Sequence, residues 1–156
     1  MMHSEILKPI VVLIAWSLVM WVWMILVRMP ALRAAGVDMG KLTGGKGSDA
    51  DRVLPAKAQW PSHNYNHLME QPTIFYAAAL VIALTGTGNG VNAWIAWGYV
   101  GLRIAHSIVQ ATFNRVAVRF ALFLLSTLCL AALTLHAGMA VWQTHSGPLV
   151  QNVASV

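Results

Sequence analysis

The sequence predicts an all-α integral membrane protein, built as a bundle of four transmembrane helices. Of its 156 residues, 58% are hydrophobic and only 10% are charged, whereas about 25% of the residues of a soluble domain are charged. The apolar residues form long runs without the alternation that is typical of a transmembrane β-strand. Because every backbone N–H and C=O group must be hydrogen-bonded inside hydrocarbon, such runs favour helices. We therefore expect residues 1–156 to form a single membrane domain.

The first predicted span covers about residues 9–27 and ends at Arg28. Its length matches the roughly 20 residues that cross a bilayer, and it exceeds the apolar core of a cleavable signal peptide. A loop over residues 28–64 follows, with six Lys or Arg residues, three prolines and a Gly-rich stretch. This composition is typical of a solvated loop without a fold of its own.

Three further spans are predicted at about residues 65–85, 91–113 and 118–142. The second of the four spans contains Pro72, where a kink is expected. The uncharged segment TGTGNG then turns the chain into the third span. Asn114 and the residue after it form the predicted turn before the fourth span, because one helix over residues 102–137 would be about 54 Å long.

The positions of the basic residues predict the orientation of the chain. The first and third loops carry Lys and Arg, whereas the second carries none. The positive-inside rule therefore places the first and third loops in the cytoplasm and both termini on the non-cytoplasmic side. The net charge of +5 is explained by this topology, so we expect no nucleic-acid partner. Cys129 is the single cysteine, which excludes an intrachain disulfide and favours a packing role.

Polar residues of separate spans are predicted to converge near the cytoplasmic side. A helical stripe in the second span contains His63, Asn66, His67 and Glu70, and a stripe in the third contains Arg103, His106, Gln110 and Asn114. Arg119 begins the fourth span, one turn after Arg115. Polar stripes in membrane helices face the bundle interior or a cavity. The pocket they would form suits an anionic, peptide-like ligand, because Arg binds carboxylates and Glu70 can bind an ammonium group.

The segments HLMEQPTIF and RIAHSIVQATFNRVAVRF resemble the MAPEG family, the membrane-associated proteins of eicosanoid and glutathione metabolism. The resemblance is to a bacterial-type member and implies a homotrimer of four-helix subunits in the bacterial inner membrane. It implies that glutathione binds as co-substrate between neighbouring subunits, near the cytoplasmic side. The implied activity is that of a glutathione transferase or peroxidase acting on a lipophilic electrophile that enters from the bilayer.

The resemblance also implies roles for individual residues. Arg119 is the candidate catalytic residue, because it matches an arginine that stabilises the glutathione thiolate, which is the nucleophilic form of a thiol. The candidate residues for glutathione binding are Asn66, His67, Glu70, Arg103, His106 and Gln110. The sequence departs from the family pattern at His67 (asparagine in the eicosanoid branch), Gln110 (tyrosine) and Phe120 (serine in one branch). These departures bear on the second substrate and on catalytic competence.

The same residues have other interpretations. Arg103 and Glu70 can form a structural ion pair, and Arg119 can be a topology determinant that reaches the headgroups. His63, His67 and Glu70 have the spacing of metal ligands on one helical face, but a membrane metalloenzyme would need more ligands, so we predict no metal site. The functional alternatives are a non-catalytic protein with the MAPEG fold and a small multidrug-type transporter that uses Glu70.

Overall fold

The computed structural model describes residues 4–41, 43–44 and 46–145. These residues form the long helices α1 (Leu7–Ala34), α2 (Ala56–Leu84), α3 (Val91–Thr112) and α4 (Val116–His145), together with the short 3₁₀-helix η1 (Gly47–Arg52). The predicted all-α fold is therefore confirmed. Both ends of the chain, predicted to be non-cytoplasmic, lie outside the described residues.

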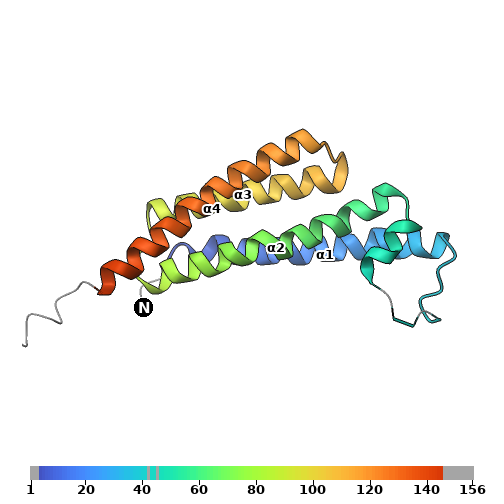
Figure 1. Cartoon of the computed structure of the whole chain (residues 1–156), viewed down its shortest axis with the longest axis horizontal. Helices are drawn as coiled ribbons and strands as arrows, with labels where there is room; N and C mark the ends of the chain where they lie inside the picture. Colours follow the sequence, from blue (N-terminus) through green and yellow to red (C-terminus); the bar gives the residue numbers. More distant parts are fainter. Residues whose placement is uncertain (1–3, 42, 45, 146–156) are drawn as a thin grey trace, which may run out of the picture.

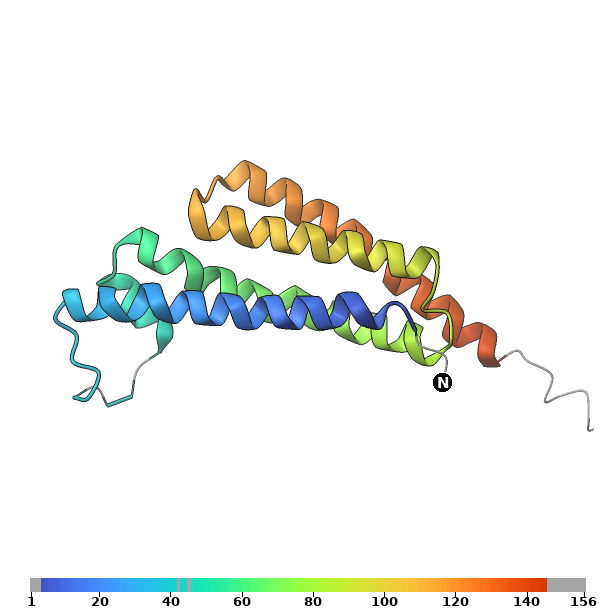
Figure 2. The same ribbon diagram turned by 180° about the vertical axis from the view of Figure 1, so that it is seen from behind.

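The helices pack as two antiparallel pairs (Figure 1). The first pair is α1 with α2, the second is α3 with α4, and α2 contacts all three other helices. The view from behind shows α1 along the outside of α2, with the first loop at one end of the bundle (Figure 2). The turn between α3 and α4 lies toward this loop end, and the turn between α2 and α3 lies at the opposite end.

Three of the described helices are long and apolar enough to cross a membrane: Leu7–Ala34, Ala56–Leu84 and Val116–Gln143. They contain the predicted spans at 9–27 and 118–142, and the predicted span at 65–85 except for its last residue. The predicted span at 91–113 is also helical, as α3, but this helix is not among the three candidate spans. The chain is thus a multi-pass membrane protein with at least these three apolar helices.

The helices end where the sequence contains residues that tolerate positive φ. Gly86 follows α2 with φ 75°, and the N–H of Thr87 donates to the Ile82 carbonyl, which is the bonding pattern of a Schellman motif. Asn114 follows α3 with φ 50°. Asparagine is one of the few non-glycine residues that adopt this conformation readily. The predicted turns at TGTGNG and Asn114 are therefore confirmed.

The first loop is more ordered than its composition predicts. α1 continues past Arg28 to Ala34, η1 forms within the loop, and α2 already begins at Ala56. The prediction that residues 28–64 have no fold is wrong for these segments. Helical hydrogen bonds satisfy the backbone of polar residues as well as that of apolar ones, so a helix can extend beyond the apolar stretch that predicts it.

Arg28 joins α1 to the loop and to the first turns of α2. Its Nη1 donates a hydrogen bond to Ser62 Oγ over 2.5 Å, and its Nη2 donates to the Gly47 carbonyl. Asp51 of η1 lies 3.7 Å from the Arg28 guanidinium and 3.0 Å from His63 Nε2. We call Arg28, Gly47, Asp51, Ser62 and His63 the loop clasp.

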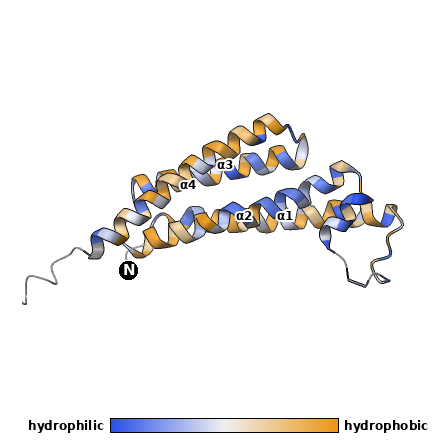
Figure 3. Ribbon diagram, in the orientation of Figure 1, coloured by the Kyte–Doolittle hydropathy of each residue, from blue (hydrophilic) through white to orange (hydrophobic). Residues whose placement is uncertain are grey.

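The bundle interior is apolar in its middle and polar toward the loop end. Phe75 of α2 stacks on Tyr99 of α3 with ring centroids 4.4 Å apart, and both side chains are fully buried. Beyond this pair, α3 buries the polar side chains of Arg103, His106 and Gln110. Figure 3 shows the hydrophilic residues on the facing sides of α2 and α3. This polar end is where the sequence predicts a binding pocket.

Candidate functional site

A hollow of about 220 Å³ opens between α2, α3 and α4. We call it the Arg119 hollow, and its lining residues are His67, His106, Val116, Arg119, Phe120 and Phe123. It combines one guanidinium and two imidazole groups with two phenyl rings. The larger hollows beside the first loop, of about 420 and 480 Å³, contain at most one of the predicted site residues.

Arg119 is positioned by the turn that precedes its helix. Its Nη1 donates a hydrogen bond to the side-chain oxygen of Asn114, the residue with positive φ that ends α3. The Nε atom of Arg119 is buried and has no hydrogen-bond partner among the described residues. A buried donor without an acceptor is unfavourable. The guanidinium is thus held in place on one side and is left with an unused donor.

The two histidines of the hollow lie edge to face, with ring centroids 6.2 Å apart. His106 is 5% exposed, and His67 Nδ1 lies 3.0 Å from Glu70 Oε2. A carboxylate accepts hydrogen bonds only, so Nδ1 carries the proton and Nε2 is the free acceptor when His67 is neutral. Glu70 itself has a side chain that is 66% exposed, so it acts on the hollow through His67.

Arg103 lies behind the hollow rather than in it. Its side chain is 1% exposed, and its Nη2 donates to the His67 carbonyl over 2.8 Å. Its Nη1 lies 3.4 Å from Gln71 Oε1, and Gln71 Nε2 in turn donates to Thr127 Oγ1 over 2.8 Å. Arg103 thus links α2 to α3, and Gln71 extends the link to α4. No ion pair joins it to Glu70 among the described ion pairs, so that interpretation of the two charges is wrong.

Arg103 is buried and Arg119 is half-buried, so their guanidinium groups place positive charge inside this end of the bundle. Within the described part of the chain, neither Arg103 nor Arg119 forms an ion pair with a carboxylate. A buried charge without a counter-charge is strongly unfavourable. The Arg119 hollow is therefore suited to an anion that supplies the missing negative charge.

Like Glu70 and Arg103, the predicted binding residues Gln110 and Asn66 are not among the residues that line the Arg119 hollow. Gln110 is 2% exposed, and its side-chain oxygen has no partner among the described residues. Asn66 is exposed and lines the hollow of about 420 Å³, next to Ser62 and Asp51 of the loop clasp. The stripe that contains Asn66 and Glu70 therefore spans two sides of α2.

Phe123, Gln71 and Asn64 have environments that the sequence did not predict. Phe123 lines the Arg119 hollow, but in the sequence it is one of many residues of an apolar run. Gln71 is the hydrogen-bond partner that extends the link from Arg103 to α4, but in the sequence it lies at the edge of an apolar run. Asn64 is fully buried with both side-chain polar atoms unpartnered among the described residues. The available signals were the spacing of Phe123 one turn after Arg119 and of Gln71 one turn after His67.

The metal-ligand spacing of α2 does not produce a cluster. His63 contacts Asp51 and His67 contacts Glu70. Among the described residues, no three His, Cys, Asp or Glu side chains come together in a way that could hold a metal ion.

A comparison with protein-family models matches residues 6–139 to the MAPEG family. Comparisons with curated proteins and with solved structures give no match. The matched region contains all four long helices up to the last turns of α4 and every residue of the Arg119 hollow. The chain belongs to the MAPEG family.

Proposed function

We propose that the chain binds glutathione in the Arg119 hollow and transfers it to a lipophilic electrophile. The observation that carries this proposal is the Arg119 guanidinium, which is held by Asn114 and has an unpartnered Nε next to His67 and His106. An arginine in a low-dielectric site stabilises an adjacent thiolate and so lowers the pKa of the bound thiol. Membership of the MAPEG family supports the choice of glutathione as the thiol.

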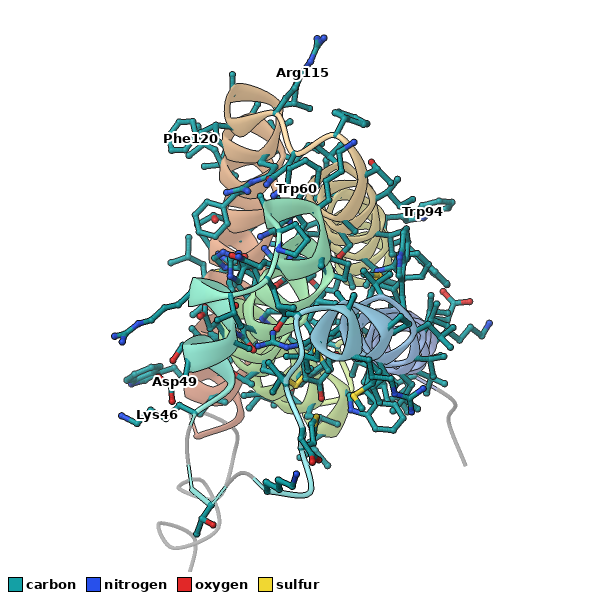
Figure 4. The ribbon with its side chains drawn as sticks, turned by 90° about the vertical axis from the view of Figure 1, so that its right-hand side faces the viewer. Lys46, Asp49, Trp60, Trp94, Arg115 and Phe120 are labelled. Atoms are coloured by element: carbon teal, nitrogen blue, oxygen red, sulfur yellow. The ribbon has the colours of Figure 1, made fainter. Side chains whose placement is uncertain are left out.

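In the proposed reaction, the glutathione thiolate attacks an electrophilic carbon. A C–S bond forms, and the leaving group departs with the electron pair of the bond that breaks. With a lipid hydroperoxide, the thiolate instead attacks the terminal oxygen, the O–O bond breaks, and the lipid alkoxide leaves and is protonated to the alcohol. The glutathione sulfenic acid that forms then reacts with a second glutathione to give the disulfide and water. The phenyl rings of Phe120 and Phe123 line the same hollow and would contact the lipophilic substrate. Figure 4 shows Phe120 on the outer side of α4, where a bilayer molecule has access.

The proposal includes a homotrimer in the bacterial inner membrane, with glutathione between neighbouring subunits. The hollow of one chain has an open side, and one of the residues that line it, Phe120, is 65% exposed. A neighbouring subunit that covers this side would complete the site. Size-exclusion chromatography with light scattering tests this part of the proposal. The detergent-solubilised protein is expected to have the mass of three chains after correction for bound detergent.

The decisive experiment compares Arg119→Ala with Arg115→Ala in the detergent-solubilised protein. Arg115 lies one turn before Arg119, is exposed, and points away from the bundle in Figure 4. Wild type and Arg115→Ala are expected to bind glutathione saturably in calorimetry and to show the ultraviolet absorbance of its thiolate. Arg119→Ala is expected to lose the thiolate absorbance. Its rate of conjugation of 1-chloro-2,4-dinitrobenzene is expected to fall by about 100-fold or more, the usual effect of removing one electrostatic stabiliser.

Each result assigns the function differently. Glutathione binding with an unchanged thiolate signal in Arg119→Ala would remove Arg119 from the catalytic role. Absence of binding for any low-molecular-weight thiol would leave a non-catalytic member of the family. Proton-coupled efflux of a cationic dye that depends on Glu70 would favour the transporter instead.

A further inference from the structure

The first described residues of the chain are fixed to the turn between α2 and α3. The N–H of Glu5 donates to Asn89 Oδ1 and the N–H of Ile6 donates to the Gly88 carbonyl, both over 2.9 Å. The Ile6 side chain is fully buried. A Cβ atom at Gly88 would lie 1.9 Å from Ser4 Oγ and 2.7 Å from Ile6 Cγ2, so this close approach requires glycine. The start of α1 is thus placed by specific contacts.

This anchoring sets two charged side chains beside two tryptophans. A hollow of about 200 Å³ is lined by Glu5, Lys8, Ala93, Trp94 and Trp97. We call it the Trp94 hollow. Its residues come from the start of α1 and the start of α3, whereas the Arg119 hollow includes the start of α4; these segments lie at opposite ends of the bundle in Figure 1. Figure 4 shows Trp94 projecting outward from α3. Trp94 is 77% exposed and Trp97 is 39% exposed, and exposed tryptophans at the end of apolar helices are typical of the membrane interface.

The two charges of this hollow do not satisfy each other. Glu5 and Lys8 are three residues apart, yet no ion pair involves either of them among the described residues. Asp38 and Lys41 of the first loop have the same spacing and do form an ion pair, at 3.3 Å. The Trp94 hollow therefore presents a carboxylate and an ammonium group that are both available to a ligand.

We propose that the Trp94 hollow binds the headgroup of a phosphatidylethanolamine molecule. Lys8 binds the lipid phosphate, and the Glu5 carboxylate accepts hydrogen bonds from the primary ammonium group, both of which are charge-assisted contacts. The indole rings contact the ammonium through cation–π attraction and the glycerol region through their apolar faces. The acyl chains follow Val12, which is one turn beyond Lys8 and 37% exposed.

This ligand is favoured over other headgroups by its donors and its charge. A choline headgroup has no N–H to donate to Glu5. A glycerol headgroup has no cation to offset the Glu5 carboxylate, and an anionic lipid would bring a second negative charge beside it. The proposal does not depend on glutathione binding, because the Trp94 hollow and the Arg119 hollow share no lining residue.

Native mass spectrometry of the full chain in detergent tests the proposal with three lipids of identical acyl chains, carrying ethanolamine, choline or glycerol headgroups. Wild type is expected to bind the ethanolamine lipid about tenfold more tightly than the other two, as expected for one additional hydrogen bond between charged groups. Glu5→Gln is expected to reduce the affinity for the ethanolamine lipid to that for the choline lipid. Lys8→Gln is expected to weaken the binding of both the ethanolamine lipid and the choline lipid to a similar extent.

Asp38 and Lys41 of the first loop supply matched controls, because Asp38→Asn and Lys41→Gln remove the same kinds of charge at the opposite end of the bundle (Figure 1). Both are expected to bind the ethanolamine lipid as wild type does. Equal binding of all three lipids, or a preference for ethanolamine that survives in Glu5→Gln, overturns the proposal. Glycerophosphoethanolamine, the headgroup without acyl chains, is expected not to displace the lipid at equal concentration. Displacement by it would make the ligand a soluble phosphate ester rather than a lipid.

Discussion

Asn114 has two roles, one for its backbone and one for its side chain. Its backbone adopts the positive φ that ends α3, and its side-chain oxygen accepts a hydrogen bond from the Arg119 guanidinium. The turn and the position of the candidate catalytic residue are therefore coupled. Substitutions at Asn114 can separate the two tasks, because glycine keeps the backbone conformation without the acceptor.

We expect Asn114→Gly to fold normally and to bind glutathione more weakly. Glycine accepts positive φ, so the free energy of unfolding should change by no more than about 0.5 kcal/mol. Loss of the acceptor frees Arg119 and should weaken glutathione binding by about three- to tenfold in calorimetry. Asn114→Ala should in addition lose about 1–2 kcal/mol of stability, because alanine is strained in the left-handed region.

Asn114→Asp is the control, since it retains an oxygen acceptor for Arg119 at the same position. Wild-type glutathione affinity in Asn114→Gly would show that Asn114 only ends the helix and does not orient Arg119.

Thr127 is the far end of the chain of contacts that starts at Arg103. Its hydroxyl accepts from Gln71 Nε2 over 2.8 Å and donates to the Phe123 carbonyl over 2.8 Å. Thr134 also donates to a carbonyl of its own helix, that of Leu130, over 2.8 Å, but among the described residues its side chain makes no hydrogen bond to another helix. Both threonines bond to their own helix, and Thr127 alone adds an interhelical bond; Thr127 is half-buried, whereas Thr134 is exposed.

We therefore expect Thr127→Val to destabilise the bundle more than Thr134→Val does. The difference in the free energy of unfolding should be about 0.6 kcal/mol, the average for hydrogen bonds between membrane helices. Reversible unfolding in mixed detergent measures both variants against wild type. Equal losses in the two variants would mean that the contact of Thr127 with Gln71 contributes nothing to stability.

At the scale of helices, the sequence predicts the apolar parts well and the polar extensions poorly. Hydropathy locates the middle of α1, α2 and α4, and the residues Gly86 and Asn114 mark where helices end. It does not predict that α2 begins at Ala56, because the nearby prolines and charges are typical of loops. The extension is stabilised by contacts between residues far apart in the sequence, such as that of Arg28 with Ser62.

For the candidate site, the sequence predicts which helix ends meet but not the direction of every side chain. Antiparallel helices bring the start of α2, the end of α3 and the start of α4 to one level, so His67, His106 and Arg119 were expected to meet. Side-chain direction decided the rest. Asn66 is one residue before His67 and faces the loop clasp instead, which a stripe drawn at helical spacing cannot resolve.

The loop clasp allows a test at this scale. We expect Arg28→Ala to detach η1 from α1, because it removes the hydrogen bonds to Ser62 and Gly47 and the ion pair with Asp51. Hydrogen bonds to a charged group contribute about 1.5–3 kcal/mol each when partly buried, so amide hydrogen exchange in residues 47–54 should accelerate by at least about tenfold. Mass spectrometry of the peptides from this segment measures the rate.

Arg33→Ala is the matched control for Arg28→Ala. Arg33 lies in the last turn of α1 and is exposed. Its side chain makes no hydrogen bond or ion pair with the other described residues. Unchanged exchange in Arg28→Ala would show that η1 is held by its own backbone bonds, such as that from the N–H of Leu54 to the Ala50 carbonyl.

At the scale of the whole molecule, α3 decides whether the chain crosses the membrane three or four times. Its 22 residues span about 33 Å at 1.5 Å per residue, which matches the hydrocarbon thickness of about 30 Å. Its polar residues, including Arg103 and Gln110, are buried against the other helices rather than exposed to lipid. Hydropathy summed over a helix ignores this direction, so we expect α3 to cross the membrane.

Single cysteines in a Cys129→Ala background test this topology with a maleimide that does not cross membranes. The positions are Met39 in the first loop, Asn89 in the turn before α3, and Phe113 after α3; Met39 and Phe113 are 53% and 55% exposed, and Asn89 is exposed as well. If α3 crosses, cysteines at 39 and 113 label from the cytoplasmic side only, as the basic loops require, and the cysteine at 89 labels from the other side. Labelling of 89 and 113 from the same side would mean that α3 lies against the bundle without crossing.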